Sequence, residues 1–82
     1  MEQIARTPQQ LGAALRRRRR SMGLSQTTLG AKTKLRQATI SAIENGEPGT
    51  RLSTLTDVMT ALGLEMAIRE RSKAGDKIED LF

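Results

Sequence analysis

Apolar residues recur every three or four positions through most of the chain, the spacing that places them on one side of a helix. The pattern breaks around residues 23–25, 33–36 and 46–51. The sequence therefore predicts four helices, over residues 8–22, 26–32, 37–45 and 52–62. The residues expected to face inward are Leu11, Leu15 and Met22 in the first helix, Ile40 and Ile43 in the third, and Leu52, Leu55, Val58, Met59 and Leu62 in the fourth.

The ends of these helices carry residues that favour initiation or termination. Thr7 can cap the first helix, Pro8 suits its first position, and Gln10 can reach back to complete a capping box. Ser25 is a good cap for the second helix. Glycines at the ends of the first and fourth helices, and Asn45-Gly46 after the third, tolerate the left-handed backbone that ends a helix.

The apolar period changes to two over residues 64–70, where Leu64, Met66 and Ile68 share one face. That alternation predicts a half-buried β-strand. Because no second strand is predicted, we expect antiparallel pairing with the same strand of a second copy across a two-fold axis. The expected organisation is a helical domain over residues 1–63, a dimerisation strand over 64–70 and a flexible tail over 71–82.

The composition limits what this chain can do. Large aliphatic and aromatic residues number 17 of 82, a thin core that would gain from a partner subunit. With Cys 0 and His 0, a disulfide framework is excluded, and the usual zinc ligands and most catalytic bases are missing. We therefore expect no enzymatic activity, small-molecule substrate, metal or cofactor. No apolar run suits a membrane span or signal peptide, so we expect a cytoplasmic protein.

Charge is distributed unevenly along the chain. Residues 1–43 carry nine basic side chains and one acidic one, whereas residues 44–82 carry five basic and eight acidic ones. A domain with one strongly basic half is expected to bind a polyanion on that side. Nucleic acid is the first candidate and an anionic membrane the second.

The apolar positions around the second and third helices have the spacing of a helix-turn-helix. Counting from Gln26, the fourth, tenth, fifteenth and eighteenth positions are apolar, and the fifth is the small Gly30. Over residues 8–64 the sequence resembles the Cro/repressor-like (Xre) helix-turn-helix family. The run from Arg36 to Ser41, the strand after the fourth helix and the aromatic-ended tail are most similar to HipB-type antitoxins. The resemblance implies an all-α, four-helix fold with room for a fifth short helical turn, a C-terminal dimerisation β-strand and a tail.

In such a domain the third helix lies in the major groove, with its N-terminal residues at the base edges. Arg36 can bond guanine and Gln37 can pair with adenine. Ala38 offers a methyl group to thymine, and Ser41, one turn beyond Gln37, can reach either class of base. The alternative is that Gln37 and Ser41 are ordinary solvated helix residues.

A second set of residues is expected to contact phosphates and to fix the register on DNA without reading sequence. By resemblance Gln26 and Thr39 belong to it, and the N-terminus of the second helix adds backbone donors. The predicted phosphate-binding residues are Arg16, Arg17, Arg20, Ser25, Gln26, Thr27, Lys32, Lys34 and Thr39.

Other positions have structural expectations. The family usually has glycine where this chain has Lys34, so Lys34 is expected at a positive φ. Arg18 replaces a usual aliphatic residue and is expected to lay its stem over the core edge. The resemblance also implies a buried ion pair between Arg19 and Glu44, which joins the first helix to the third.

The resemblance implies that a homodimer binds a palindromic double-stranded operator and represses its own operon at the nucleoid. It also implies a HipA-type Ser/Thr kinase toxin as partner, held by the acidic surface after residue 43 and by the tail. Leu81 and Phe82 would form the hook of that tail, or a frayed terminus. Three alternatives are a stand-alone Xre regulator, a protein inhibitor that does not bind DNA, and a peripheral membrane protein. The last is disfavoured because the first helix lacks a broad apolar face.

Overall fold

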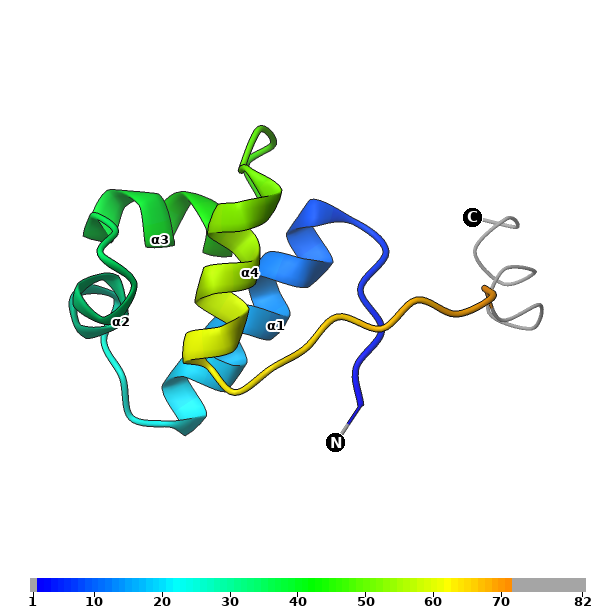
Figure 1. Cartoon of the computed structure of the whole chain (residues 1–82), viewed down its shortest axis with the longest axis horizontal. Helices are drawn as coiled ribbons and strands as arrows, with labels where there is room; N and C mark the ends of the chain where they lie inside the picture. Colours follow the sequence, from blue (N-terminus) through cyan, green and yellow to red (C-terminus); the bar gives the residue numbers. More distant parts are fainter. Residues whose placement is uncertain (1, 72–82) are drawn as a thin grey trace.

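The computed structural model describes residues 2–71. Four helices follow one another: α1 (Pro8–Ser21), α2 (Gln26–Thr33), α3 (Gln37–Glu44) and α4 (Leu52–Ala61). They surround one core, with α1 and α2 both packed against α3 and with α4 packed against α2 (Figure 1). The four predicted helices are confirmed, with bounds that differ by one residue at a few ends.

The predicted caps form as the sequence implied. The hydroxyl of Thr7 accepts from the backbone N–H of Gln10 at 3.0 Å, and Oε1 of Gln10 accepts from the N–H of Arg6 at 2.7 Å. The Thr7 cap predicted for α1 is confirmed, whereas Gln10 reaches back to the N–H of Arg6, one residue before the N-cap, instead of the N–H of Thr7 that a capping box uses. Ser25 caps α2 by accepting from the N–H of Thr28 at 3.0 Å.

The core comes from all four helices, and its buried apolar residues are Leu15, Leu29, Ile40, Ile43, Val58, Met59 and Leu62. Close approach of α1 to α3 depends on Gly12, because a Cβ there would lie 2.4 Å from the carbonyl oxygen of Ile43. Two predicted core residues are outside the core. Leu52 is 66% exposed, and Met22, which ends α1 as its C-cap, is 41% exposed.

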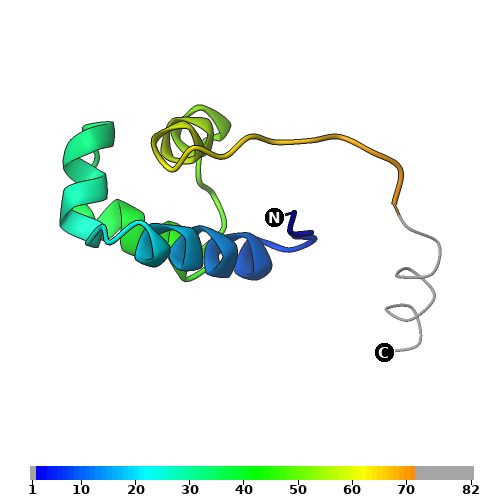
Figure 2. The same ribbon diagram turned by 90° about the horizontal axis from the view of Figure 1, so that it is seen from below.

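The predicted strand at 64–70 is not formed in the single chain. Residues 64–70 have no regular secondary structure, and the described residues contain no β-strand. In Figure 2 this segment runs away from the helical body as an extended strip. A strand needs a neighbour for its backbone groups, and residues 2–71 of one chain offer none. No helical turn follows α4 in residues 62–71, so the fifth turn is also absent there.

Residues 72–82, which include Leu81 and Phe82 and nearly all of the predicted tail, lie outside the described residues. Among residues 2–71, no helix combines the length and apolarity needed to cross a membrane.

Candidate nucleic-acid interface

The turn between α2 and α3 sets the direction of α3. Lys34 ends α2 with φ 58° and ψ 35°, the left-handed conformation predicted for this position. The N–H of Leu35 then bonds the carbonyl of Gly30 at 2.8 Å. A Cβ at Gly30 would lie 2.6 Å from the carbonyl oxygen of Leu35, so only glycine fits this crossing. The turn therefore joins the two helices at close range.

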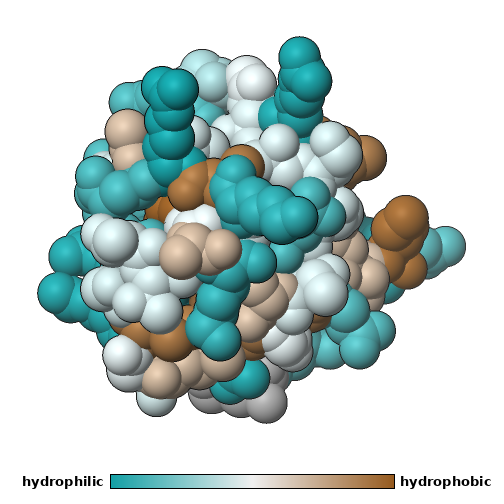
Figure 3. All heavy atoms as spheres, turned by 60° about the vertical axis from the view of Figure 1, so that its left-hand side comes forward, coloured by the Kyte–Doolittle hydropathy of each residue, from teal (hydrophilic) through white to brown (hydrophobic). Residues whose placement is uncertain are grey.

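The N-terminal residues of α3 face outward. Ile40 and Ile43 are buried, whereas Gln37 and Ala38 are exposed and Ser41 is half-buried. Arg36 is the N-cap of α3, is exposed, and makes no side-chain bond to the helix. The four predicted base-reading residues thus come from one element. Figure 3 turns forward the side that carries α2 and α3, where hydrophilic residues and residues of intermediate hydropathy form most of the surface, with a few hydrophobic patches between them.

A chain of hydrogen bonds connects this surface to the interior. Nε2 of Gln37 donates to Oε1 of Gln26, and Nε2 of Gln26 donates to Oε1 of Glu44 at 3.0 Å. Glu44 in turn holds Arg19 through two bonds, at 2.6 and 3.0 Å. Gln26 was predicted only as a phosphate contact; the structure shows that it also positions Gln37.

The Arg19–Glu44 pair expected from the resemblance is confirmed. Side-chain exposure is 9% for Arg19 and 3% for Glu44, and Nη1 of Arg19 also donates to the carbonyl of Leu24 at 2.7 Å. The pair joins α1 to the end of α3 and to the residue before the α2 cap. The ion pair therefore links α1, α3 and the segment before α2, and Gln26 links α2 to the same carboxylate.

The charges of this pair stabilise each other despite burial. Burial raises the pKa of the Glu44 carboxyl, but hydrogen bonds from Arg19 and Gln26 and the charges of Arg19 and Arg16 outweigh it. The pKa of Glu44 therefore lies below its ordinary value. The hydrogen bond to Glu44 raises the pKa of Arg19, so both groups stay ionised near neutral pH.

The helical turn distributes the arginines of α1 around its axis. Arg16 and Arg20 lie one turn apart on an exposed flank, and Arg16 is close enough to Glu44 to affect it. Arg17 instead donates to Oε1 of Gln3 at 2.8 Å, and Nε of Arg18 donates to the carbonyl of Leu62 at 2.9 Å. Arg16 and Arg20 are thus the α1 arginines left on the side of α3.

The other predicted phosphate-binding residues lie around α2 and α3. Thr27, Lys32 and Lys34 are exposed, and Thr39 is half-buried. The hydroxyl of Ser25 is already used by its cap and by a 2.9 Å bond to the hydroxyl of Thr28. The phosphate donors at this site are therefore the backbone N–H groups at the N-terminus of α2 rather than the Ser25 hydroxyl.

One basic residue near α3 was not predicted from the sequence. An open groove separates α3 from the loop that follows it, and both Arg36 and Arg51 line the groove. Arg51 is exposed and is the N-cap of α4. Arg51 was missed because residues 44–82 are acidic overall. The sequence signal that could have placed it near α3 is its position directly after the short Glu47-Pro48-Gly49-Thr50 loop.

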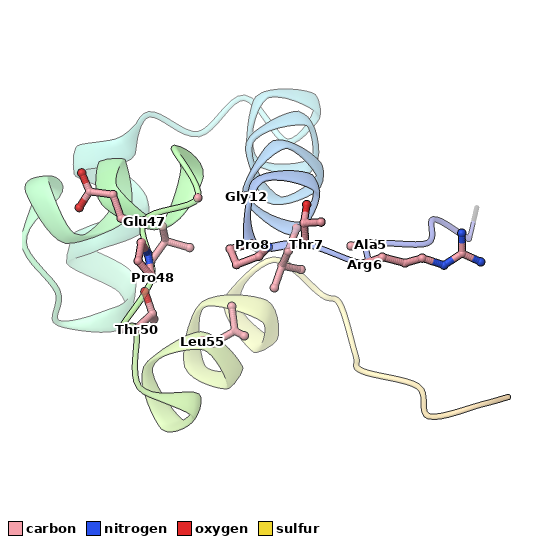
Figure 4. A pocket seen from close by; sticks show the side chains of 13 residues that line it. Ala5, Arg6, Thr7, Pro8, Gly12, Glu47, Pro48, Thr50 and Leu55 are labelled. Carbon is pink, nitrogen blue, oxygen red and sulfur yellow. The ribbon is translucent and has the colours of Figure 1, made fainter. Parts of the chain in front are cut away.

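A second hollow, of about 330 Å³, lies between the start of α1 and the α3–α4 loop (Figure 4). Its lining includes the apolar Pro8, Leu11 and Leu55, and the only acid in it is Glu47. Residues 2–71 hold no group of three or more His, Cys, Asp or Glu side chains that could bind a metal ion.

Comparison with known proteins identifies the family. A model of the family described as "Helix-turn-helix domain" matches residues 10–72. Antitoxin HipB of Escherichia coli strain K12 is 34% identical over 68 residues, which span 83% of this chain and 77% of HipB. The chain belongs to the Xre-type helix-turn-helix family, and within it the chain is HipB-like.

Solved structures of the family agree with this assignment. HipB in a HipA–HipB–O2–O3 complex superposes with a TM-score of 0.79 at 32% identity, covering 87% of this chain and 100% of HipB. A HipB variant with an O2 20mer gives 0.81 at 32% identity, covering 88% and 100%. The restriction-modification controller protein C.AhdI of Aeromonas hydrophila gives 0.65 at 31% identity, covering 71% and 84%. This chain is therefore a DNA-binding helix-turn-helix protein of the antitoxin class, a family that is not enzymatic.

Proposed function

We propose that this protein is a sequence-specific repressor that binds a palindromic operator as a homodimer. The proposal rests mainly on the outward face of α3. Its first residue, Gln37, is held by Gln26, which is itself bonded to Glu44 of the buried ion pair. The HipB complexes with operator 20mers support DNA as the ligand of this face. A repressor of this kind acts by occupying its own promoter at the nucleoid.

In the proposed complex, α3 enters the major groove and Arg36 bonds O6 and N7 of guanine. Gln37 keeps one amide hydrogen on Gln26. Its second hydrogen and its carbonyl oxygen remain for N7 and the N6 amino group of adenine, the pattern that distinguishes this base. Ala38 and Ser41 contribute a methyl contact and a hydroxyl. Each two-bond contact discriminates against a wrong base by about 1–3 kcal/mol.

The phosphate contacts surround this face. Arg16 and Arg20 on one flank, and Lys32, Lys34, Thr27 and Thr39 around α2 and α3, supply salt-dependent affinity. Gln26 has one amide hydrogen left for a phosphate, beside the backbone N–H groups that follow Ser25. We add Arg51 to this set and assign Arg17 the weakest contact, because Gln3 already holds its guanidinium.

The homodimer forms, in this proposal, by antiparallel pairing of residues 64–70 from two copies. Met66 is 51% exposed and Ile68 is fully exposed in the single chain. A second copy would cover both side chains and pair the backbone. The helical domain would then end at residue 63, as the sequence pattern suggests.

Selection from a random DNA duplex library tests operator binding and does not require a known site. The expected outcome is an enriched palindrome whose half-sites lie about one helical turn, roughly 34 Å, apart. Arg36→Ala should relax the preference at one base pair of each half-site. Gln9→Ala, an exposed glutamine on α1, is the matched control and should select the same sequence as the wild type. Enrichment of no sequence would contradict the proposal.

We also propose that the protein neutralises a HipA-type Ser/Thr kinase toxin. The HipA–HipB–operator complex supports a toxin partner for a protein of this class. The acidic-leaning residues after position 43 and the tail, with Leu81 and Phe82 as its hook, are the proposed contacts. Co-expression with the HipA-type kinase of the same genome should rescue growth, and deletion of residues 72–82 should weaken the rescue. Unchanged toxicity with the full chain would contradict this role.

A stand-alone regulator is the second candidate, favoured by the likeness to C.AhdI, which is a controller of a restriction-modification system. It predicts the same operator selection. It also predicts that no HipA-type kinase is retained on the immobilised protein.

A further inference from the structure

The segment after α4 has one anchored residue and a run of unpaired ones. The backbone N–H of Leu64 donates to the carbonyl of Met59 at 2.8 Å, and its side chain packs against the core. From Glu65 to Glu70, no backbone group is hydrogen-bonded to another backbone group of residues 2–71. Strand pairing with a second copy can therefore begin only after Leu64.

The side chains of this segment restrict how two copies can pair. Met66 and Ile68 share one face, while Glu65, Ala67 and Arg69 share the other. Facing residues of an antiparallel pair lie on the same side of the sheet. A register that opposes an even position to an odd one would therefore set the apolar face against the charged one. Registers whose two-fold axis passes through residue 66, 67 or 68 keep like faces together.

Of these three registers, the structure and the facing residues favour the one with its axis at Ala67. An axis at Met66 requires Leu64 to face Ile68, but Leu64 is bound to its own domain. An axis at Ile68 sets Met66 against Glu70, an apolar residue against an acid. An axis at Ala67 sets Met66 against Ile68 twice and Glu65 against Arg69 twice, so that every facing pair from 65 to 69 is complementary.

We propose that the dimer strand is self-complementary about Ala67, with Glu65 of each copy paired to Arg69 of the other. The proposal rests on the strand-paired homodimer proposed above and fixes its register. The opposite charges lie on one face of the two-stranded ribbon and the four apolar side chains on the other. Facing positions bring Cβ atoms to about 4.5–5.5 Å, within reach of an ion pair for these long side chains.

Arg69 already has one acidic neighbour within its own chain. Its Nη1 lies 2.7 Å from Oε1 of Glu2, and the side chains are 52% and 74% exposed. In Figure 1 the N-terminal arm and residues 64–70 overlap in projection, and the Glu2–Arg69 ion pair links the two segments. Because an exposed pair of this kind is weak, Glu2 does not prevent Arg69 from engaging a second copy. It does require a control that separates the two acids.

Cysteine scanning tests the register directly, because the chain contains no other cysteine. Facing Cα atoms of antiparallel strands lie about 4.5–5.5 Å apart, which suits a disulfide. Only a residue on the two-fold axis faces itself. Ala67→Cys should therefore form a covalent dimer fastest, while Met66→Cys and Ile68→Cys should cross-link to each other in a mixture and only slowly to themselves.

Each outcome of the scan has a defined meaning when sedimentation velocity is run alongside. Fastest self-cross-linking at 66 or at 68 would overturn the register while leaving the strand dimer intact. A protein that sediments as a dimer but cross-links at none of the three positions would overturn strand pairing itself, and the register with it. DNA binding is measured separately and decides neither point.

Charge reversal gives an independent test. Glu65→Arg and Arg69→Glu should each weaken the homodimer, because both place like charges opposite each other twice. A mixture of the two variants restores both pairs, so the heterodimer should be about tenfold tighter than either homodimer. Glu2→Gln should leave the dimerisation constant within twofold. Rescue of Glu65→Arg by Arg71→Glu instead of Arg69→Glu would place the axis at Ile68 and contradict the proposal.

Discussion

Replacing Glu44 by glutamine is expected to remove most of the stability of this domain. The substitution keeps the shape of the side chain but removes the charge that faces Arg19 at 2.6 Å. Arg19 is left as a cation whose side chain is only 9% exposed, with only neutral acceptors, the carbonyl of Leu24 and the amide oxygen of the new glutamine. Removing one partner of a buried pair in this way costs about 3–5 kcal/mol, because the other charge stays buried.

That cost is large for a chain of 82 residues. Small domains have a total free energy of unfolding of about 5–15 kcal/mol, and a thin core lies near the lower end. With a urea slope of about 1 kcal/mol per molar, the midpoint should fall by about 3 M or more. Far-UV circular dichroism is the suitable signal, since the chain has no Trp or Tyr. Protein concentration must be held constant because dimerisation adds to apparent stability.

The double variant Arg19→Met/Glu44→Leu provides the control. It removes both charges and fills a similar volume, so its stability should return close to that of the wild type or exceed it. A Glu44→Gln variant that loses less than about 1 kcal/mol would refute the reasoning. It would mean that this ion pair does not hold α1 to α3.

Three further predictions concern acid, the α2–α3 turn and the loop after α3. The pKa of Glu44 is lower in the folded state than in the unfolded chain. Its contribution to the free energy of unfolding is therefore complete above the unfolded pKa, about 4.3, and is lost as the pH falls through the folded pKa. Urea titrations from pH 6 to 3 should show this loss, and the loss should be smaller in Glu44→Gln. Lys34→Gly should raise the free energy of unfolding by about 1 kcal/mol, because it relieves the left-handed backbone strain at this position. Gly30→Ala should lower it through the clash with the carbonyl of Leu35, and urea denaturation measures both changes. Arg51→Ala removes one phosphate contact from each protomer of the dimer, so it should reduce the slope of log affinity against log salt by about 1.8 without changing the selected sequence. An unchanged slope would exclude a phosphate contact.

Much of the fold is predictable because local signals agree with one another. The N-cap at Thr7, the cap at Ser25 and the small residue at Gly30 each have a physical cause that the sequence shows, and the structure confirms all three. The left-handed turn at Lys34 followed from comparison with the family pattern, since the residue itself gives no sign of it.

The exposure of Leu52 and Met22 could not be predicted from the sequence, because it depends on where the helices and their neighbours end. The helical period places Leu52 in the apolar stripe of α4, but the buried part of that stripe is its second half, at Val58 and Met59. Periodicity shows which residues share a face and not where the neighbouring helices end. Met22 is exposed for a related reason, since α1 ends at Ser21, one residue before it.

The candidate site was predictable in its members and less so in its connections. Exposure of Arg36, Gln37 and Ala38 follows from the period of α3. The link from Gln37 through Gln26 to Glu44 joins residues up to 18 positions apart and depends on the crossing of two helices. The strand at 64–70 is a different case, because its partner is another molecule.

The central claim is that the N-terminal residues of α3 read DNA sequence. The most direct measurement is the ratio of affinities for the selected operator and for a scrambled duplex at one fixed salt concentration, for the wild type and for Arg36→Ala/Gln37→Ala. We predict a wild-type ratio of about 10³ or more. In the double variant this ratio should fall by at least tenfold, with only a small change in affinity for the scrambled duplex. A variant that keeps the wild-type ratio would contradict the claim.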